Sequence, residues 1–166
     1  AEKITSLCFS GDGKKAAVGG QDGKVRIFDI DAAKGPGAVE IKACDKGVSD
    51  MALTADASTL IVSDQDGEVT IWDVAKKAKL HTIKGAHAQR VIALAVSRDG
   101  KRVATAGMDN VVKLWDLAAG KELRSWDYQV PFQKEKAFVL NLAFTPDGKG
   151  LCSANGDSTI WILELP

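Results

Sequence analysis

This 166-residue chain has little of what marks disulfide-rich, membrane-spanning or nucleic-acid-binding proteins. It has only three cysteines, Cys8, Cys44 and Cys152, and no C-x-x-C pair, which argues against a disulfide framework and a cysteine zinc site. Lys plus Arg and Asp plus Glu are balanced at 22 each, so no net charge favours nucleic acid. No apolar run approaches the roughly 18 residues that cross a bilayer, and no signal-like segment opens the chain. We therefore expect a protein of a reducing compartment, the cytoplasm, with no nucleic-acid or membrane partner.

The sequence shows no helical periodicity of its apolar residues, but it contains an internal repeat. Four segments align without a gap, and each reads as strand, turn, strand, turn, strand. They span residues 4–30, 48–74, 91–117 and 139–165, so they begin 44, 43 and 48 residues apart. These steps match the roughly 40–45 residues of a four-stranded propeller blade. We predict an all-β single domain over residues 1–166, with repeats at 4–47, 48–90, 91–138 and 139–166.

The first unit shows how the strands are predicted. Apolar residues recur along residues 4–9, and Asp12-Gly13 and Asp22-Gly23 mark tight turns. Glycine tolerates a positive φ at such turns, and aspartate bonds to the nearby backbone. The predicted strands of this unit are residues 4–10, 14–20, 24–30 and 38–43. Outer strands of the next two units are placed at residues 80–84 and 122–126.

The unit endings Ile27-Phe28-Asp29, Ile71-Trp72-Asp73 and Leu114-Trp115-Asp116, and the Gly85-Ala86-His87 before the third unit, carry a family resemblance. Together with the Asp-bearing turns, they resemble the WD-repeat β-propeller family over nearly the whole chain. The resemblance implies four β-propeller blades and a non-catalytic scaffold that holds a partner. Rings of this family usually have more than four blades, commonly seven or eight.

His87 is the most reactive-looking side chain, and it has two interpretations. A general base would need an accessible pocket beside it. The resemblance implies instead a buried hydrogen-bonded chain that ties strands together, formed by His87, Thr105, Asp109 and Trp115. We favour this structural interpretation. The other three units have no histidine at the matching position, and we expect them to depend on apolar packing.

No other group of residues points to chemistry. The acidic run at residues 64–67 lacks the later ligands and the bidentate glutamate of a calcium loop, so it is interpreted as a turn. We predict no catalytic residue, no metal site and no cofactor, and we do not expect the chain to be an enzyme.

The link between the third and fourth units is the strongest candidate for partner binding, because repeated positions mostly encode the fold. Residues 127–138 mix aromatic and basic side chains, which are favoured at interfaces. The alternative is that this link folds back over its blade. In the family, this link and the turns that hold the repeated aspartates share one face. We therefore predict a protein-binding surface that contains Tyr128, Phe132, Lys134, Lys136, Gln21, Gln65, Met108 and Arg90.

The fourth unit stops at Pro166, directly after its third strand, so that the last blade lacks an outer strand. This leaves Ile160, Ile162 and Leu163 on an exposed strand edge, and such edges recruit other strands. Two routes would cover it. The chain is the C-terminal half of a longer seven- or eight-bladed ring, or two copies form a homodimer with eight blades. The abrupt start at the first strand favours the longer ring.

Three functions stay open. A protein-interaction scaffold that presents a rigid propeller face fits best, because the sequence shows no chemistry. A structural half-propeller that only completes a larger ring is the second. A ligand-binding domain of a larger enzyme is the third.

Overall fold

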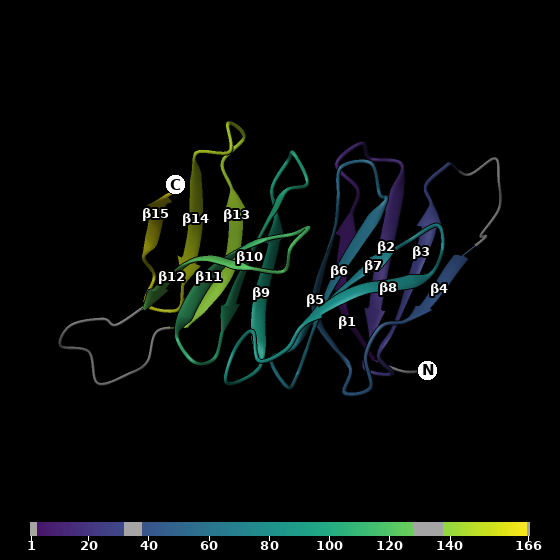
Figure 1. The fold of residues 1–166 in the computed structure, drawn as a ribbon, viewed down its shortest axis with the longest axis horizontal. Coiled ribbons are helices and arrows are strands. Elements are labelled where there is room, and N and C mark those ends of the chain that lie inside the picture. The colour runs from purple at the N-terminus through teal and green to yellow at the C-terminus, as the bar shows by residue number, and fades with distance from the viewer. Residues whose placement is uncertain (1–2, 32–37, 128–137, 166) are drawn as a thin grey trace.

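The computed structural model describes residues 3–31, 38–127 and 138–165, which form four antiparallel sheets with no helix among them (Figure 1). Each sheet is one repeat, with its strands hydrogen-bonded in chain order. Blade 1 contains β1 (Ile4–Phe9), β2 (Lys15–Gly20), β3 (Lys24–Asp29) and β4 (Ala38–Lys42). These bounds lie within one residue of the predicted strands.

Blades 2 to 4 repeat this order. Blade 2 contains β5 (Val48–Leu53), β6 (Thr59–Asp64), β7 (Val69–Asp73) and β8 (Ala78–Ile83). Blade 3 contains β9 (Val91–Val96), β10 (Arg102–Gly107), β11 (Val111–Asp116) and β12 (Glu122–Asp127). Blade 4 has three strands, β13 (Val139–Phe144), β14 (Gly150–Asn155) and β15 (Ile160–Glu164). The predicted all-β propeller architecture is thus confirmed, with an incomplete last blade.

A carboxylate closes the turn between the first two strands of every blade. In blade 1, Asp12 Oδ1 accepts hydrogen bonds from Ser10 Oγ at 2.6 Å and from the Lys14 amide at 3.0 Å. The Ser10 hydroxyl, followed by the Lys14 amide, lowers the pKa of Asp12 below its ordinary value. The same hydroxyl–carboxylate pair recurs in the other blades as Thr54–Asp56, Ser97–Asp99 and Thr145–Asp147. The S/T-x-D pattern of the sequence therefore directs four identical turns.

Neighbouring blades pack face to face, with an apolar cluster at each interface. Between blades 1 and 2, Ile27 packs in the same cluster as Met51 and Leu60. Equivalent clusters lie between blades 2 and 3 and between blades 3 and 4. Full burial of one such side chain contributes about 1.5–3 kcal/mol. The three interfaces therefore hold the blades as one stack.

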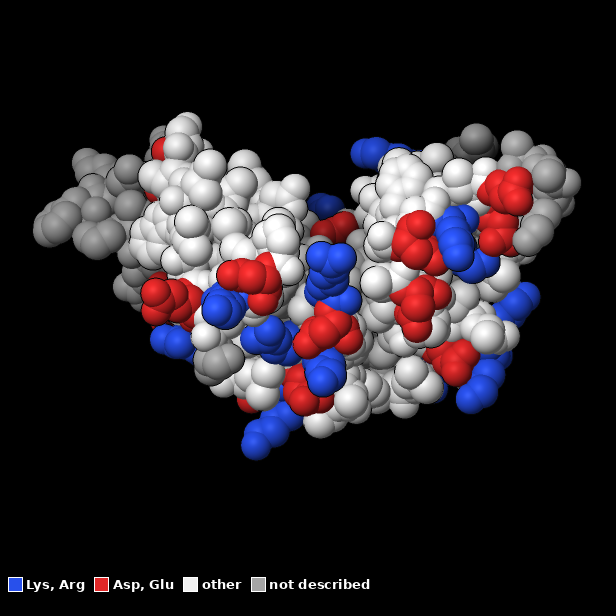
Figure 2. All heavy atoms as spheres, turned by 90° about the horizontal axis from the view of Figure 1, so that it is seen from above, with Lys and Arg blue, Asp and Glu red and all other residues white. Residues whose placement is uncertain are grey.

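The first strands of successive blades lie side by side along the inner edge of this stack. Asp50 on β5 joins three of them, because its carboxylate accepts from Ser6 Oγ on β1 at 2.9 Å and from the Leu94 amide on β9 at 2.8 Å. Burial raises the pKa of Asp50, and the hydrogen bonds from Ser6, Met51 and Leu94 oppose that rise. The molecule has the outline of a crescent with a hollow on one side, and acidic and basic side chains lie next to one another on the face shown in Figure 2.

Candidate interaction surface

The turns between the second and third strands of the blades lie at one edge of the crescent, next to the residues that precede the first strands. The Gln21 amide donates to the Lys3 carbonyl, and the Met108 amide donates to the Arg90 carbonyl, both at 2.9 Å. In blade 4, the Gly156 amide donates to the Phe138 carbonyl at 2.9 Å. We call this the turn edge: residues 20–23, 64–67, 107–110 and 155–158, together with Lys3, Arg90 and Phe138.

Four of the residues predicted to bind a partner lie on the turn edge. Gln21 and Gln65 are exposed in the turns of blades 1 and 2, and the Met108 side chain is 36% exposed in blade 3. Arg90 is exposed as well, but its Nε donates to Ser49 Oγ at 2.8 Å. Arg90 therefore also ties blade 3 to blade 2. The other four predicted residues, Tyr128, Phe132, Lys134 and Lys136, lie outside the described residues.

The structure brings His87, Asp109, Thr105 and Trp115 together in one chain of hydrogen bonds. His87 Nδ1 lies 2.9 Å from Asp109 Oδ1, and His87 Nε2 lies 2.7 Å from Thr105 Oγ1. The Trp115 Nε1–H donates to the same hydroxyl oxygen at 2.9 Å. The segment before blade 3 is thereby joined to β10 and β11. His87 is only 2% exposed, so its ring is not accessible to a substrate as a general base would need to be.

The protonation state of His87 follows from its burial. Burial lowers the pKa of His87 below 6.5, although the hydrogen bond to Asp109 opposes that shift. A neutral ring satisfies every partner: Nδ1–H donates to Asp109, and Nε2 accepts the Thr105 hydroxyl proton. For Asp109, burial raises the pKa, but hydrogen bonds from His87, Ala88 and Val111 bring it below its ordinary value. A neutral imidazole beside an ionised carboxylate is therefore the stable pair.

Acidification is expected to destabilise the protein through this histidine. Because the pKa of His87 is lower in the folded state than the unfolded value of 6.5, the unfolded chain binds the extra proton. The stability that His87 contributes is fully present above that pH and is lost as the pH falls below it. Urea unfolding across this range, compared with His87→Gln, measures the effect. An equal pH dependence in both proteins would contradict it.

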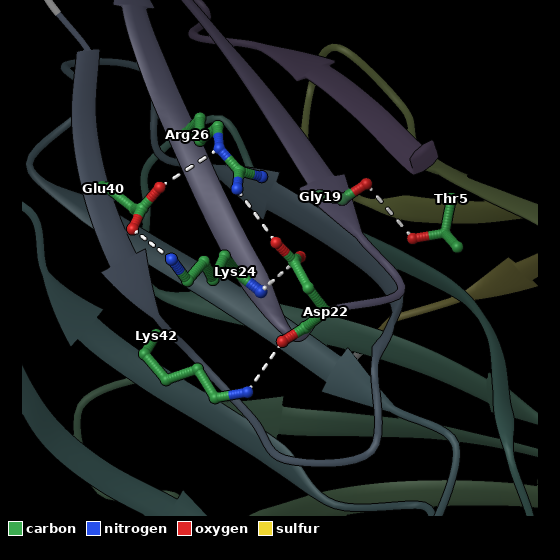
Figure 3. A network of polar contacts seen from close by, with 7 residues as sticks. All are labelled: Thr5, Gly19, Asp22, Lys24, Arg26, Glu40 and Lys42. Atoms are coloured by element: carbon green, nitrogen blue, oxygen red, sulfur yellow. Dashed lines mark hydrogen bonds and ion pairs between the residues drawn. The ribbon is translucent and has the colours of Figure 1, made fainter. Parts of the chain in front are cut away.

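Blade 1 satisfies its turn aspartate in another way. Val18 and Phe28 occupy the positions of Thr105 and Trp115, so no hydroxyl or indole is present there. Asp22 Oδ2 instead accepts a hydrogen bond from Arg26 Nη2 at 2.9 Å (Figure 3). This contact, followed by the Lys24 amide, lowers the pKa of Asp22.

The same arginine extends the contact into an ion-pair network on the blade surface. Arg26 Nε lies 3.2 Å from Glu40 Oε2, and Lys24 Nζ lies 2.7 Å from Glu40 Oε1. Lys42 Nζ donates to the Asp22 carbonyl at 2.7 Å (Figure 3). Lys24, Arg26 and Glu40 are partly exposed, and exposed ion pairs of this kind contribute only about 0–1 kcal/mol each.

Blade 2 contains a bond that the sequence analysis missed. Val62 replaces the expected hydroxyl, but Trp72 Nε1 donates to Thr70 Oγ1 at 3.0 Å, with both side chains buried. Thr70 and Trp72 are two residues apart on β7, so they share one face of the strand. A hydroxyl two positions before the tryptophan was the signal that could have found it.

In the turn between β6 and β7 of blade 2, the Asp64 carboxylate accepts hydrogen bonds from the Asp66 and Glu68 amides, each at 3.0 Å.

A small cavity between blades 3 and 4 was also missed. Its volume is about 130 Å³, and it is lined by Val112, Trp126, Asp127, Ser153, Trp161 and Leu163. Leu163 stands where blades 2 and 3 have tryptophan, which was the available signal. Cofactor and drug-sized ligands occupy pockets of roughly 300–1,000 Å³, so this cavity fits only a small group.

Among the described residues, neither the buried thiols nor the metal-ligating side chains form a further site. Burial raises the pKa of Cys8 to about 12 and that of Cys44 to about 11, so both thiols stay protonated at neutral pH. Residues 3–31, 38–127 and 138–165 contain no group of three His, Cys, Asp or Glu side chains that could hold a metal ion. In this described part, no helix is long and apolar enough to cross a membrane.

Comparison with known proteins assigns the repeat. The family model for the WD domain, G-beta repeat, matches residues 1–29, 38–73, 77–116 and 128–163. Protein groucho of Drosophila melanogaster is 24% identical over 161 residues, which cover 97% of this chain and 21% of groucho, so the chain spans about a fifth of that relative. The crystal structure of the computationally designed Ika4 protein has the same fold, with a TM-score of 0.78 at 22% identity over 99% of this chain and 92% of that one. The matched repeats cover most of the sequence, and the chain belongs to the WD40 repeat family.

Proposed function

We propose that the chain is a non-catalytic interaction module that binds a protein partner through its turn edge. The observation that carries this proposal is that the reactive side chain at this edge is buried and hydrogen-bonded, whereas side chains suited to protein binding are exposed on it. Inside, the ring nitrogens of His87 are both engaged and the side chain is buried. Outside, Gln21, Gln65 and Met108 project from turns whose backbone is fixed by hydrogen bonds or close packing.

The chemistry of these exposed side chains favours a protein partner. Glutamine amides can donate to and accept from peptide groups, and methionine adapts its thioether to irregular apolar surfaces. The chain carries no net charge, which gives nucleic acid no electrostatic attraction to the molecule as a whole. Tyr128, Phe132, Lys134 and Lys136 remain part of the proposed surface on the sequence argument alone.

The rigidity of the turn edge supports the same proposal. Residues preceding the first strands are bonded to the turns at 2.9 Å in blades 1, 3 and 4. A preformed surface loses little conformational freedom on binding, so more of the contact energy remains as affinity. Because Cys8, Cys44 and Cys152 are free thiols, a reducing compartment such as the cytoplasm is the proposed location.

Substitution of Met108 by aspartate is expected to weaken partner binding at least tenfold, because a charge would replace an apolar contact on the turn edge. The measurement is retention of a stoichiometric protein from a cell extract by the immobilised chain. Leu80→Asp is the matched control, since Leu80 is an exposed apolar residue on β8, outside the turn edge. Equal retention by wild type and Met108→Asp would contradict the proposed surface, and so would loss with the control alone.

A further inference from the structure

The small cavity between blades 3 and 4 lies inside the stack, where two described blades face each other. One wall belongs to blade 3 and the other to blade 4: Val112, Trp126 and Asp127 face Ser153, Trp161 and Leu163. Val112 and Ser153 are each 2% exposed, whereas Trp161 is 41% exposed and Asp127 is exposed as well. The cavity therefore has a buried floor and a mouth toward solvent.

The cavity exists because blade 4 has a leucine where blade 3 has a tryptophan. The sequence analysis placed Leu163 on the exposed edge with Ile160 and Ile162, but it packs against blade 3 instead. Leu163 occupies on β15 the register position that Trp115 occupies on β11. In blade 3 the buried indole of Trp115 donates its Nε1–H to Thr105 Oγ1 at 2.9 Å. Leucine is smaller and has no N–H, so blade 4 lacks both the ring and the donor.

Ser153 is the counterpart of Thr105, and its hydroxyl lacks the partners that Thr105 has. Thr105 Oγ1 accepts from Trp115 and also lies 2.7 Å from His87 Nε2. Blade 4 has neither a tryptophan nor a histidine at the equivalent positions. No hydrogen bond joins the Ser153 hydroxyl to another residue that the structure describes. A buried hydroxyl without a partner costs free energy, so a ligand that supplies one gains affinity.

The size and the lining of the cavity favour a single small ring. An apolar cavity of about 150 Å³ binds benzene, and this one has a volume of about 130 Å³. The indoles of Trp126 and Trp161 form part of its walls, and aromatic rings pack favourably on one another. Water fits less well, because an enclosed water needs two to four polar partners. Among the lining residues, Ser153 is the polar one that is buried.

A cationic ligand is disfavoured, because Arg124 Cζ already lies 5.1 Å from the centre of the Trp126 ring. We propose that the cavity binds one neutral aromatic ring that carries an N–H or O–H group, with this group hydrogen-bonded to Ser153 Oγ. The ring takes the place of the indole that blade 4 lacks. A free heterocycle and a side chain of a protein partner both offer this chemistry. The inference does not depend on the proposed partner binding.

Pyrrole and furan are matched probes, because both are five-membered aromatic rings and only pyrrole has an N–H. In NMR spectra of the chain, added pyrrole should shift the indole N–H signals of Trp126 and Trp161 in a saturable way. The signals of Trp72 and Trp115, which are buried in blades 2 and 3, should stay in place. Furan should bind roughly two- to tenfold more weakly, the factor that corresponds to one hydrogen bond. Ser153→Ala should remove this difference and leave furan binding nearly unchanged.

Leu163→Trp tests the location of the site. The new indole should fill the cavity, donate to Ser153 Oγ and abolish the binding of both probes. Leu80→Trp is the matched control and should bind pyrrole as the wild type does, since Leu80 is exposed on β8 of blade 2. Circular dichroism shows whether each variant is folded, and the Ser153→Ala comparison does not require Leu163→Trp to fold.

Three results would each overturn the proposal. They are no saturable shift in the wild type, equal binding of pyrrole and furan, and shifts that persist in folded Leu163→Trp. Saturable pyrrole binding that meets these criteria supports it whatever the source of the natural ring. Competition then identifies that source: excess pyrrole releases a retained protein if the ring is a partner's side chain, and it leaves retention unchanged if the ring belongs to a free molecule.

Discussion

Replacement of Gly67 by alanine is expected to lower the free energy of unfolding by about 2–5 kcal/mol, from left-handed backbone strain and overpacking together. Gly67 has a φ of 85° in the turn between β6 and β7. A Cβ at this position would collide with the carbonyl oxygens of His87 and Gln89, which belong to the backbone that leads into blade 3. Neither oxygen can move without shifting that segment. Urea or thermal unfolding measures the loss.

Gly85→Ala is the matched control for this experiment. Gly85 has a φ of 60°, but a Cβ there would meet no atom within 4 Å. This variant should therefore lose only the backbone strain, about 1–2 kcal/mol. The difference between the two variants isolates the close approach between blade 2 and the segment before blade 3. If both variants lost the same free energy of unfolding, the backbone before blade 3 would have to lie farther from residue 67 than it does in the structure.

Replacement of Asp109 by alanine is expected to destabilise the protein by about 1–3 kcal/mol, because a buried donor loses its acceptor. The buried donor is His87 Nδ1–H, 2.9 Å from the carboxylate, and the exposed Ala88 amide at 3.0 Å loses the same acceptor. Thr105→Val should also destabilise, because it removes the partner of both His87 and Trp115. Chemical unfolding of both single variants and the double variant gives the coupling between the two positions.

The double variant distinguishes a connected chain of bonds from separate contacts. If the network acts as a unit, the combined loss should be smaller than the sum of the single losses by more than about 0.5 kcal/mol. Additive losses would mean that Asp109 and Thr105 act independently, and the proposed structural role of the chain of bonds would fail.

The strands were predictable because apolar residues recur at fixed positions between clear turn signals. The bounds of β1 to β4 differ from the predicted ranges by at most one residue. The outer strand β8 begins at Ala78 rather than at residue 80, because its first residues are exposed and carry no apolar pattern. An exposed outer strand follows its neighbour through backbone pairing, here Asp73 with Ala78, which leaves little trace in the sequence.

Contacts that cross between elements were harder to predict. Asp50 could not be recognised as a link between three blades, because its partners Ser6 and Leu94 are each 44 residues away along the chain. The Arg26–Asp22 contact was not predicted, because the family pattern pairs the turn aspartate with a histidine and not with an arginine. The Asp50 bonds depend on how strands of different blades stack, which no single segment of sequence contains, whereas Asp22 and Arg26 lie within one turn and strand.

Hydrogen–deuterium exchange on the chain, alone and with the protein that it retains in the pull-down, tests the proposed function most directly. The account predicts slower exchange on binding at the turn edge, in the amides of residues 20–23, 64–67 and 107–110. It predicts no change in the turns at the opposite end of the same strands, residues 11–14, 55–58 and 98–101. Protection of those opposite turns, with the turn edge unchanged, would contradict it.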